Sequence, residues 1–189
     1  MTLHVITMRT GDKYSPDYVD KLERAVSRHL SLPYTFECIR ETKRPGWWGK
    51  VELFERYSGD GFLWLDLDVV ITGPLDDLCN TDADIRVGMN TAKANPNGCQ
   101  SSVMFWRDCE PISALFTGGM MAELKGDQDW ITYLRDTDVI EVDYFNPAHV
   151  VSYKHKCMNG LPEDARVVNF HGKPDPHEVQ DQWVRDNWL

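Results

Sequence analysis

The segment FLWLDLDVV, residues 62–70, places two aspartates directly after a run of apolar residues. An apolar run without alternation is typical of a strand that is buried on both faces in a parallel sheet. Asp66 and Asp68 are two residues apart, so an extended strand points both carboxylates the same way, at the edge of the sheet where α/β folds bind ligands. The segment therefore predicts a buried strand that ends at a ligand-binding site.

The rest of the chain predicts one domain around that strand. A length of 189 residues, with 42% hydrophobic and 26% charged residues, is typical of a single globular domain. Apolar segments with strand patterns alternate with helical ones, which predicts an α/β fold with a mostly parallel central sheet flanked by helices, over residues 1–189. We expect strands at 3–8, 34–39, 62–70, 85–90, 99–106, 139–145 and 166–171, and helices at 16–29 (capped by Ser15), 47–57, 126–136 and 177–189.

Charge and cysteine usage restrict the partners and the compartment. A net charge of -10 disfavours nonspecific attraction to a polyanion. No stretch reaches the roughly 20 apolar residues of a membrane span, and the first residues, MTLHVITMRT, lack the pattern of a secretory signal. The five cysteines include no CxxC pair, so we expect reduced thiols and a cytoplasmic protein.

Two neighbouring carboxylates at a strand end favour a metal site. They repel each other, which raises the pKa of one of them unless a cation lies between them. Oxygen ligands suit Mn²⁺ or Mg²⁺, and these ions commonly bridge a phosphate to a protein. The alternative is that DLD only begins a solvated turn, because short motifs often occur by chance.

Three further stretches accompany LDLDVV in the chain: GWWGKVELF before it, and KGDQDW and NFHGKPDPHE after it. Together, and in this order, they resemble the nucleotide-sugar glycosyltransferases of the GT-A fold. The resemblance is to the retaining family-eight enzymes of the glycogenin and bacterial galactosyltransferase type, and especially to small relatives in bacteria and phages. It implies a single Rossmann-like GT-A domain that transfers a sugar, with retention, from a nucleotide-diphosphate donor, UDP-sugar above all, to a hydroxyl acceptor.

The resemblance also implies roles for individual residues. It assigns three residues to the metal ion, Mn²⁺ or Mg²⁺: Asp66, Asp68 and His171. It assigns five to the donor: Thr7, Arg9, Lys50, Asp66 and Lys173. It assigns three to catalysis: Lys50, Asp127 beside the sugar hydroxyls, and Gln128 near the anomeric carbon.

Each of these residues also has an ordinary structural interpretation. His171 can be a strand-end histidine held by a hydrogen bond, Lys50 and Lys173 can be solvated lysines, and Asp127 can be a helix cap. Trp47 and Trp48 can stack on an acceptor, although core packing is the simpler role for both.

Two other functions fit parts of the sequence. DLDVV also matches the nucleophile motif of haloacid-dehalogenase-like phosphatases, with Asp66 attacking phosphate. Ser101 or Ser102, Lys125, and Asp127 with Asp129 follow in the right order, although that nucleophile normally ends the first strand of its fold. The third hypothesis is a non-catalytic module that binds a nucleotide sugar without turning it over.

The acceptor stays open between a glycan, a protein, a small molecule and a hydroxymethylated DNA base. KRPGWWGK and YKHK mix basic and aromatic residues, as proteins that hold single strands or flipped bases do. The acidic net charge argues against DNA. The cations in these two stretches are equally compatible with an ordinary surface: Lys43, Arg44, Lys154 and Lys156.

Overall fold

The structure is a computed structural model, and it describes residues 2–90 and 97–189. Its strands are β1 (Leu3–Met8), β2 (Tyr34–Ile39), β3 (Gly61–Leu65), β4 (Val69–Ile71), β5 (Ile85–Met89), β6 (Cys99–Trp106), β7 (Val142–Tyr144), β8 (Val150–Ser152) and β9 (Val167–Asn169). Its α-helices are α1 (Asp17–His29), α2 (Leu53–Arg56), α3 (Pro111–Ala114), α4 (Met120–Glu123), α5 (Asp127–Asp136) and α6 (Gln182–Asn187). Shorter helical turns are η1 (Gly46–Glu52), η2 (Asp76–Leu78), η3 (Tyr153–Cys157) and η4 (Pro176–Glu178).

The central sheet is mostly parallel, as the sequence predicts. Among the described residues it has six strands in the order β2-β1-β3-β6-β5-β7. β1 is parallel to β2 and β3, and β5 is parallel to β7, whereas β6 runs antiparallel to both of its neighbours. The carboxyl ends of β1, β3 and β5 therefore reach the same edge of the sheet.

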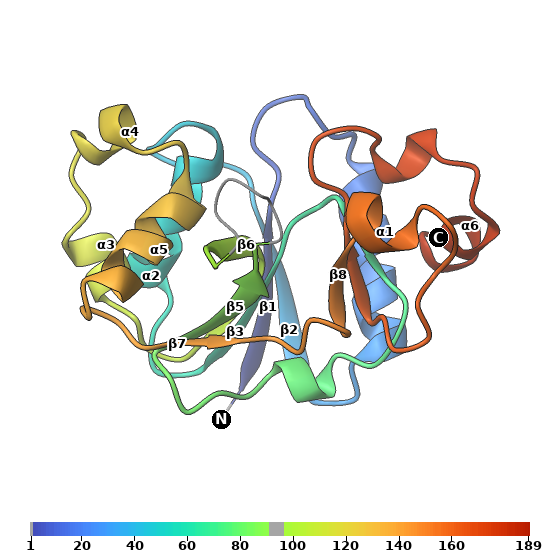
Figure 1. The fold of residues 1–189 in the computed structure, drawn as a ribbon, viewed down its shortest axis with the longest axis horizontal. Helices are drawn as coiled ribbons and strands as arrows, with labels where there is room; N and C mark the ends of the chain where they lie inside the picture. The colour runs from blue at the N-terminus through green and yellow to red at the C-terminus, as the bar shows by residue number, and fades with distance from the viewer. Residues whose placement is uncertain (1, 91–96) are drawn as a thin grey trace.

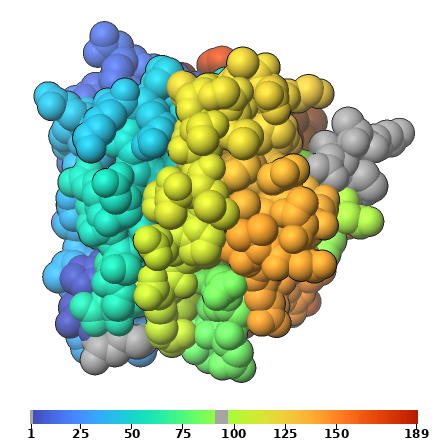
Figure 2. All heavy atoms as spheres, turned by 90° about the vertical axis from the view of Figure 1, so that its left-hand side faces the viewer, coloured from blue at the N-terminus to red at the C-terminus, as the bar shows by residue number. Residues whose placement is uncertain are grey.

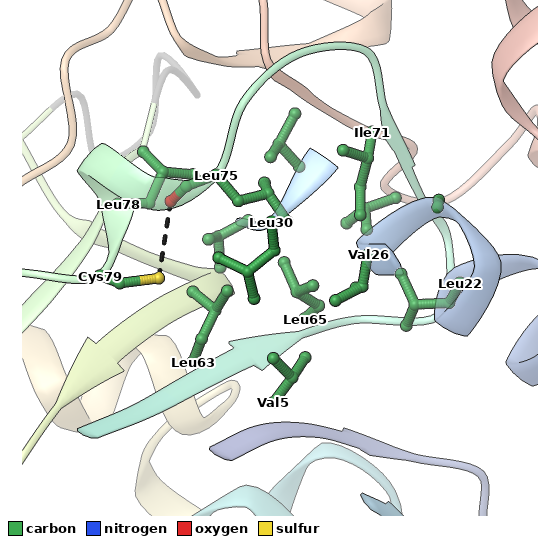
Figure 3. Close-up of a cluster of buried hydrophobic side chains, with 14 of the residues drawn as sticks. Val5, Leu22, Val26, Leu30, Leu63, Leu65, Ile71, Leu75, Leu78 and Cys79 are labelled. Atoms are coloured by element: carbon green, nitrogen blue, oxygen red, sulfur yellow. Dashed lines mark hydrogen bonds between the residues drawn. The ribbon is translucent and has the colours of Figure 1, made fainter. Parts of the chain in front are cut away.

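Helices cover both faces of this sheet (Figure 1). On one face α1 packs its apolar side, including Leu22 and Val26, against Leu63 and Leu65 of β3 in a single cluster of buried side chains, which Figure 3 shows in close-up. On the other face η1, α2, α3 and α5 pack over the sheet and enclose a second cluster centred on Trp64; Figure 2 shows the outside of this helical layer. The central sheet is therefore the middle of three layers.

A second, three-stranded sheet in the order β4-β9-β8 was not expected. The prediction that residues 62–70 form one strand was wrong. β3 ends at Leu65, and β4 begins at Val69 in the other sheet. Leu67 between them is also buried, so the apolar pattern continues through the turn and conceals it. The acidic motif is thus the junction between two sheets.

Other differences from the prediction are local. The Ser15 side chain makes no capping hydrogen bond, and the N-cap position of α1 is Pro16. The C-terminal helix exists as α6, and Trp188 after it packs edge-on against Tyr18 of α1. No helix in the described part of the chain is both long and apolar enough to cross a membrane.

Candidate active site

A buried lysine connects two of the predicted acidic residues. Lys50 lies on η1 and is only 7% exposed. Its ammonium lies 2.7 Å from Asp66 Oδ1 and 3.8 Å from Asp127 Oδ2, and it donates a 3.1 Å hydrogen bond to the Ser101 carbonyl. Burial alone lowers the pKa of Lys50, but Asp127 and Asp66 outweigh it and raise that pKa above its usual value. Lys50 is therefore a fixed cation between two carboxylates.

Close packing of η1 puts Lys50 in this position. A Cβ on Gly49 would lie 2.8 Å from the Cγ2 of Thr42, so only glycine lets η1 approach the preceding segment without displacing it. Lys50 is the next residue.

Asp127 is the first residue of α5 and is buried. Burial raises the pKa of its carboxyl, and the neighbouring Lys50 ammonium and Ser101 hydroxyl oppose that rise. Its Oδ2 has no hydrogen-bond partner among the described residues. One buried carboxylate oxygen is thus left with no partner except the more distant Lys50.

Asp66 and Asp68 lie close to each other but use different partners. Asp66 accepts a 3.0 Å hydrogen bond from the Trp64 indole, whereas Asp68 accepts a 2.7 Å hydrogen bond from the Tyr14 hydroxyl. The Lys13 ammonium in turn donates to the Tyr14 oxygen. Burial and the charge of Asp66 raise the pKa of Asp68 to about 6. Burial and Asp66 together outweigh the effects of Lys13 and Lys50 on Asp68, so a further cation beside the pair would be favoured.

His171 directly follows Phe170, whose backbone is hydrogen-bonded to the acidic motif. The Phe170 amide donates a 3.0 Å hydrogen bond to the Asp68 carbonyl, which continues the ladder between β9 and β4. The His171 Nε2 pairs with the Ser152 hydroxyl at 2.7 Å, and burial, Lys154 and His155 lower the pKa of its imidazole. Within residues 2–90 and 97–189, no three His, Cys, Asp or Glu side chains are already gathered as a metal cluster. The backbone of His171 therefore lies near the motif, whereas its side chain is paired with Ser152.

The remaining predicted donor residues lie in varied surroundings. Thr7 is fully buried in β1, and Arg9 donates a 2.7 Å hydrogen bond to the Tyr14 carbonyl. Lys173 is exposed and forms ion pairs with Asp175 and Glu178. Arg9 therefore supports the loop that carries Tyr14, and Lys173 is a solvated cation at the rim.

Gln128 and His171 line the same cavity, which has a volume of about 670 Å³. Gln128 follows Asp127 at the start of α5. The cavity thus adjoins the group formed by Lys50, Asp66 and Asp127.

The two tryptophans lie in different surroundings. Trp48 is buried against Phe116. Trp47 is 56% exposed and lies over the start of α5, where a Cβ on Gly126 would be 3.3 Å from its Nε1. Among the basic residues of the two mixed stretches, Arg44 pairs with Glu52, and every lysine except the buried Lys50 is exposed: Lys43, Lys154 and Lys156.

Sequence reasoning missed two residues that hold the site together, Tyr14 and Trp64, and it considered Ser101 only for the phosphatase motif. A signal existed for Trp64, because it precedes Asp66 by two residues in a strand and so shares its face. Tyr14 is the one aromatic residue of the turn-rich segment TGDKYSP, but only the fold shows that this loop reaches Asp68.

No protein-family model matches the chain, and no curated protein sequence matches it. Solved structures do match. The glycosyltransferase GlyE of Streptococcus pneumoniae TIGR4 aligns with a TM-score of 0.69 and 11% identity, over 98% of this chain and 62% of GlyE. The galactosyltransferase LgtC, solved with donor and acceptor sugar analogues, aligns with a TM-score of 0.61 and 12% identity, over 92% of this chain and 88% of LgtC.

The fold is that of the GT-A glycosyltransferases. A glycosyltransferase that acts in the glycosylation of the major capsid of PBCV-1 shares this GT-A fold, with a TM-score of 0.64 and 15% identity over 92% of this chain and 95% of its own. The chain spans about three fifths of the length of GlyE. The expected GT-A fold is therefore confirmed.

Proposed function

We propose that this protein is a glycosyltransferase that uses a nucleotide-diphosphate sugar, with UDP-sugar as the favoured donor. The observation that carries the proposal is the contact of Lys50 with Asp66 and Asp127. A fixed cation and two carboxylates at the ends of a strand and a helix can hold the hydroxyls of a sugar. The neighbouring structures, which are glycosyltransferases, support the same function.

The acidic motif fits a divalent cation. Asp66 and Asp68 supply hard oxygen donors, and burial together with the charge of Asp66 raises the pKa of Asp68 despite the nearby Lys13 and Lys50, so a further cation at this place is favoured. His171, whose pKa is lowered, supplies a neutral imidazole once it leaves Ser152. We assign the metal to these three residues. A bound Mn²⁺ or Mg²⁺ supplies charge neutralisation for the departing diphosphate.

In the proposed transfer, individual residues of the chain have separate roles. Asp127 accepts hydrogen bonds from sugar hydroxyls through its unpartnered Oδ2, and Lys50 keeps that carboxylate ionised. Gln128 places its amide oxygen near the anomeric carbon, where positive charge develops. A variant of LgtC in which an active-site glutamine is replaced by glutamate has been studied, which supports a glutamine in such a place.

The bond changes of the proposed transfer balance without another reactant. The bond from the anomeric carbon to the diphosphate breaks, and its electron pair stays on the diphosphate. The acceptor oxygen bonds to the same carbon, and its proton passes to the diphosphate. The resemblance described above favours retention of configuration.

The phosphatase hypothesis receives less support from the same geometry. It requires a lysine from the Lys125 position, but Lys125 is exposed and its backbone amide bonds to Asp129. The cation that contacts Asp66 is Lys50 instead.

The test is thermal stabilisation of the purified protein by UDP, GDP and CDP, each with and without Mn²⁺. We expect UDP to raise the Tm only when Mn²⁺ is present, and Asp68→Ala to remove this effect while the exposed control Asp82→Ala keeps it. If no nucleotide raises the Tm, and the protein hydrolyses p-nitrophenyl phosphate with Mg²⁺, the transferase proposal is wrong. Binding of UDP without transfer or hydrolysis of any UDP-sugar would indicate the non-catalytic module.

A further inference from the structure

The cavity beside Gln128 has a chemical character that the proposed function does not explain. It lies where the ends of β5 and β6 face the small sheet, with β8 across from them (Figure 1). Its volume of about 670 Å³ is that of a pocket for one small molecule. The inference below rests on the proposed function and concerns what this cavity binds.

Asn169 gives the cavity a hydrogen-bond acceptor that no described residue uses. Asn169 is only 6% exposed and lines the cavity, and its Oδ1 has no hydrogen-bond partner among the described residues. Its Nδ2 donates a long, 3.4 Å hydrogen bond to Gln100 Oε1. The amide of Gln100 is held in turn by Ser102, through its hydroxyl and its backbone amide. An oriented, unpaired carbonyl oxygen of this kind favours a ligand that donates a hydrogen bond, such as a hydroxyl.

Much of the remaining lining of the cavity is aliphatic. Its apolar lining comes from the end of β5, the loop before β8, β8 itself and the segment after η3: Met89, Pro147, Ala148, Val150, Val151 and Pro162. No Phe, Tyr or Trp is among the described residues that line it. A sugar ring alone therefore finds none of these large rings to stack on, whereas an apolar group attached to the sugar can cover the aliphatic lining.

The charges around the cavity argue against an anionic occupant. The described residues that line the cavity include one lysine, Lys156, and two acids, Glu163 and Asp164. A phosphorylated acceptor or a DNA strand would meet no excess of positive charge.

We propose that this cavity is the acceptor site, and that the acceptor is an uncharged, amphipathic small molecule: a sugar or polyol whose hydroxyls face Asn169 and whose apolar substituent lies on the wall that includes Met89. The acceptor hydroxyl then lies beside Gln128, which lines the same cavity. Of the acceptor classes that the sequence left open, the proposal chooses a small molecule and rejects a DNA base.

The test uses the intact protein with its seven methionines labelled at their methyl groups with ¹³C. Hexyl and phenyl β-glycosides of glucose, galactose and N-acetylglucosamine are titrated, without donor, below their micelle concentrations. We expect at least one glycoside to shift the Met89 methyl signal and to leave that of Met158, an exposed methionine outside the cavity, unchanged. Glucose 6-phosphate and a single-stranded oligonucleotide with a hydroxymethylated base should leave Met89 unchanged.

Two variants separate the two sides of the site. Met89→Ser should weaken binding of the hexyl glycoside about 5-fold, because the methionine is partly exposed and contributes part of the apolar contact, while Met158→Ser should not. Asn169→Ala should weaken every glycoside that binds by about 5-fold. Gly160→Ala is avoided as a control because Gly160 has a positive φ.

The outcomes distinguish this inference from the proposed function. If no glycoside shifts Met89 up to millimolar concentrations, while UDP with Mn²⁺ still stabilises the protein, the acceptor inference is wrong and the transferase proposal stands. A shift of Met89 by the oligonucleotide or by glucose 6-phosphate alone would also overturn it. If the glycosides bind but no nucleotide does, the cavity is a glycoside site without a donor site, and its role as an acceptor site is wrong.

Discussion

The Lys50 ammonium lies 2.7 Å from Asp66 Oδ1 in a buried ion pair, and the second carboxylate, Asp127, extends this pair into a triad. Taking these charges out of water costs free energy, which their mutual attraction offsets only while all of them are present. The contribution of this triad to stability can be measured without substrate.

Lys50→Met should lower the free energy of unfolding at pH 7.5 by about 3 kcal/mol, since two carboxylates would lose their common cation. Urea denaturation measures this loss. Lys43→Met, at an exposed position of the preceding segment, is the matched control and should change stability by less than about 0.5 kcal/mol. Equal stability of the two variants would mean that the triad contributes nothing to folding. The double variant Lys50→Met/Asp127→Asn should recover part of the loss.

Asp68→Asn should stabilise the metal-free protein at neutral pH. The pKa of Asp68 is about 6 in the folded state, against 3.8 for an unperturbed aspartate, so the folded state binds more protons between these values. The wild type therefore loses stability as pH rises through this range, and the variant does not. We expect the Tm of the variant to be higher by about 3–8 °C at pH 7.5 in chelator, and equal below pH 4.

Asp82→Asn, at an exposed position, is the control for this measurement and should leave the Tm unchanged at both pH values. A lower Tm for Asp68→Asn at pH 7.5 would show that the carboxylate of Asp68 stabilises the fold.

Tyr14→Phe should weaken the binding of Mn²⁺ about 10-fold, because Asp68 loses the hydroxyl that orients its carboxylate. Isothermal titration with Mn²⁺ alone measures this without any substrate. Tyr34→Phe on β2 removes a hydroxyl of the same type away from the acidic motif and should bind Mn²⁺ like the wild type. Unchanged affinity in Tyr14→Phe would restrict Tyr14 to a structural role in its loop.

Gln128→Ala should lower kcat about 100-fold and leave the donor affinity within about 3-fold, because its amide oxygen acts on charge that develops only in the transition state. Single-turnover transfer and nucleotide-dependent stabilisation give the two values. Gln182→Ala on α6 is the control. A parallel loss of donor affinity would place Gln128 in ground-state binding instead.

Much of the fold follows from local patterns in the sequence. The segments at 34–39 and 99–106 are strands with the predicted bounds, and the helical spacing of Tyr18, Leu22 and Val26 gives the buried face of α1. The small sheet was not predictable, because β8 has only three residues and β4 continues the apolar pattern of β3. Periodicity cannot locate a turn whose central residue is itself buried.

Part of the site was also predictable from local patterns in the sequence. Motifs in three separate stretches supplied Lys50, Asp66 and Asp127, and the structure brings these residues together. The metal set of Asp66, Asp68 and His171 stays a prediction, as does the role of Lys173. The role of Tyr14 could not be predicted from the sequence, because its contact with Asp68 joins a loop to a strand end far along the chain.

The position of the acidic motif between two sheets has a mechanical consequence. The Asp66 amide bonds to the Ser102 carbonyl in the central sheet, whereas the Asp68 carbonyl accepts from Phe170 at the end of β9 in the small sheet. Each aspartate is thus anchored to a different sheet, and the separation of their carboxylates depends on how the two sheets are placed relative to each other. A substitution of Val70, which packs with Val168 inside the small sheet, would therefore alter the separation of the two carboxylates without removing any side chain of the motif.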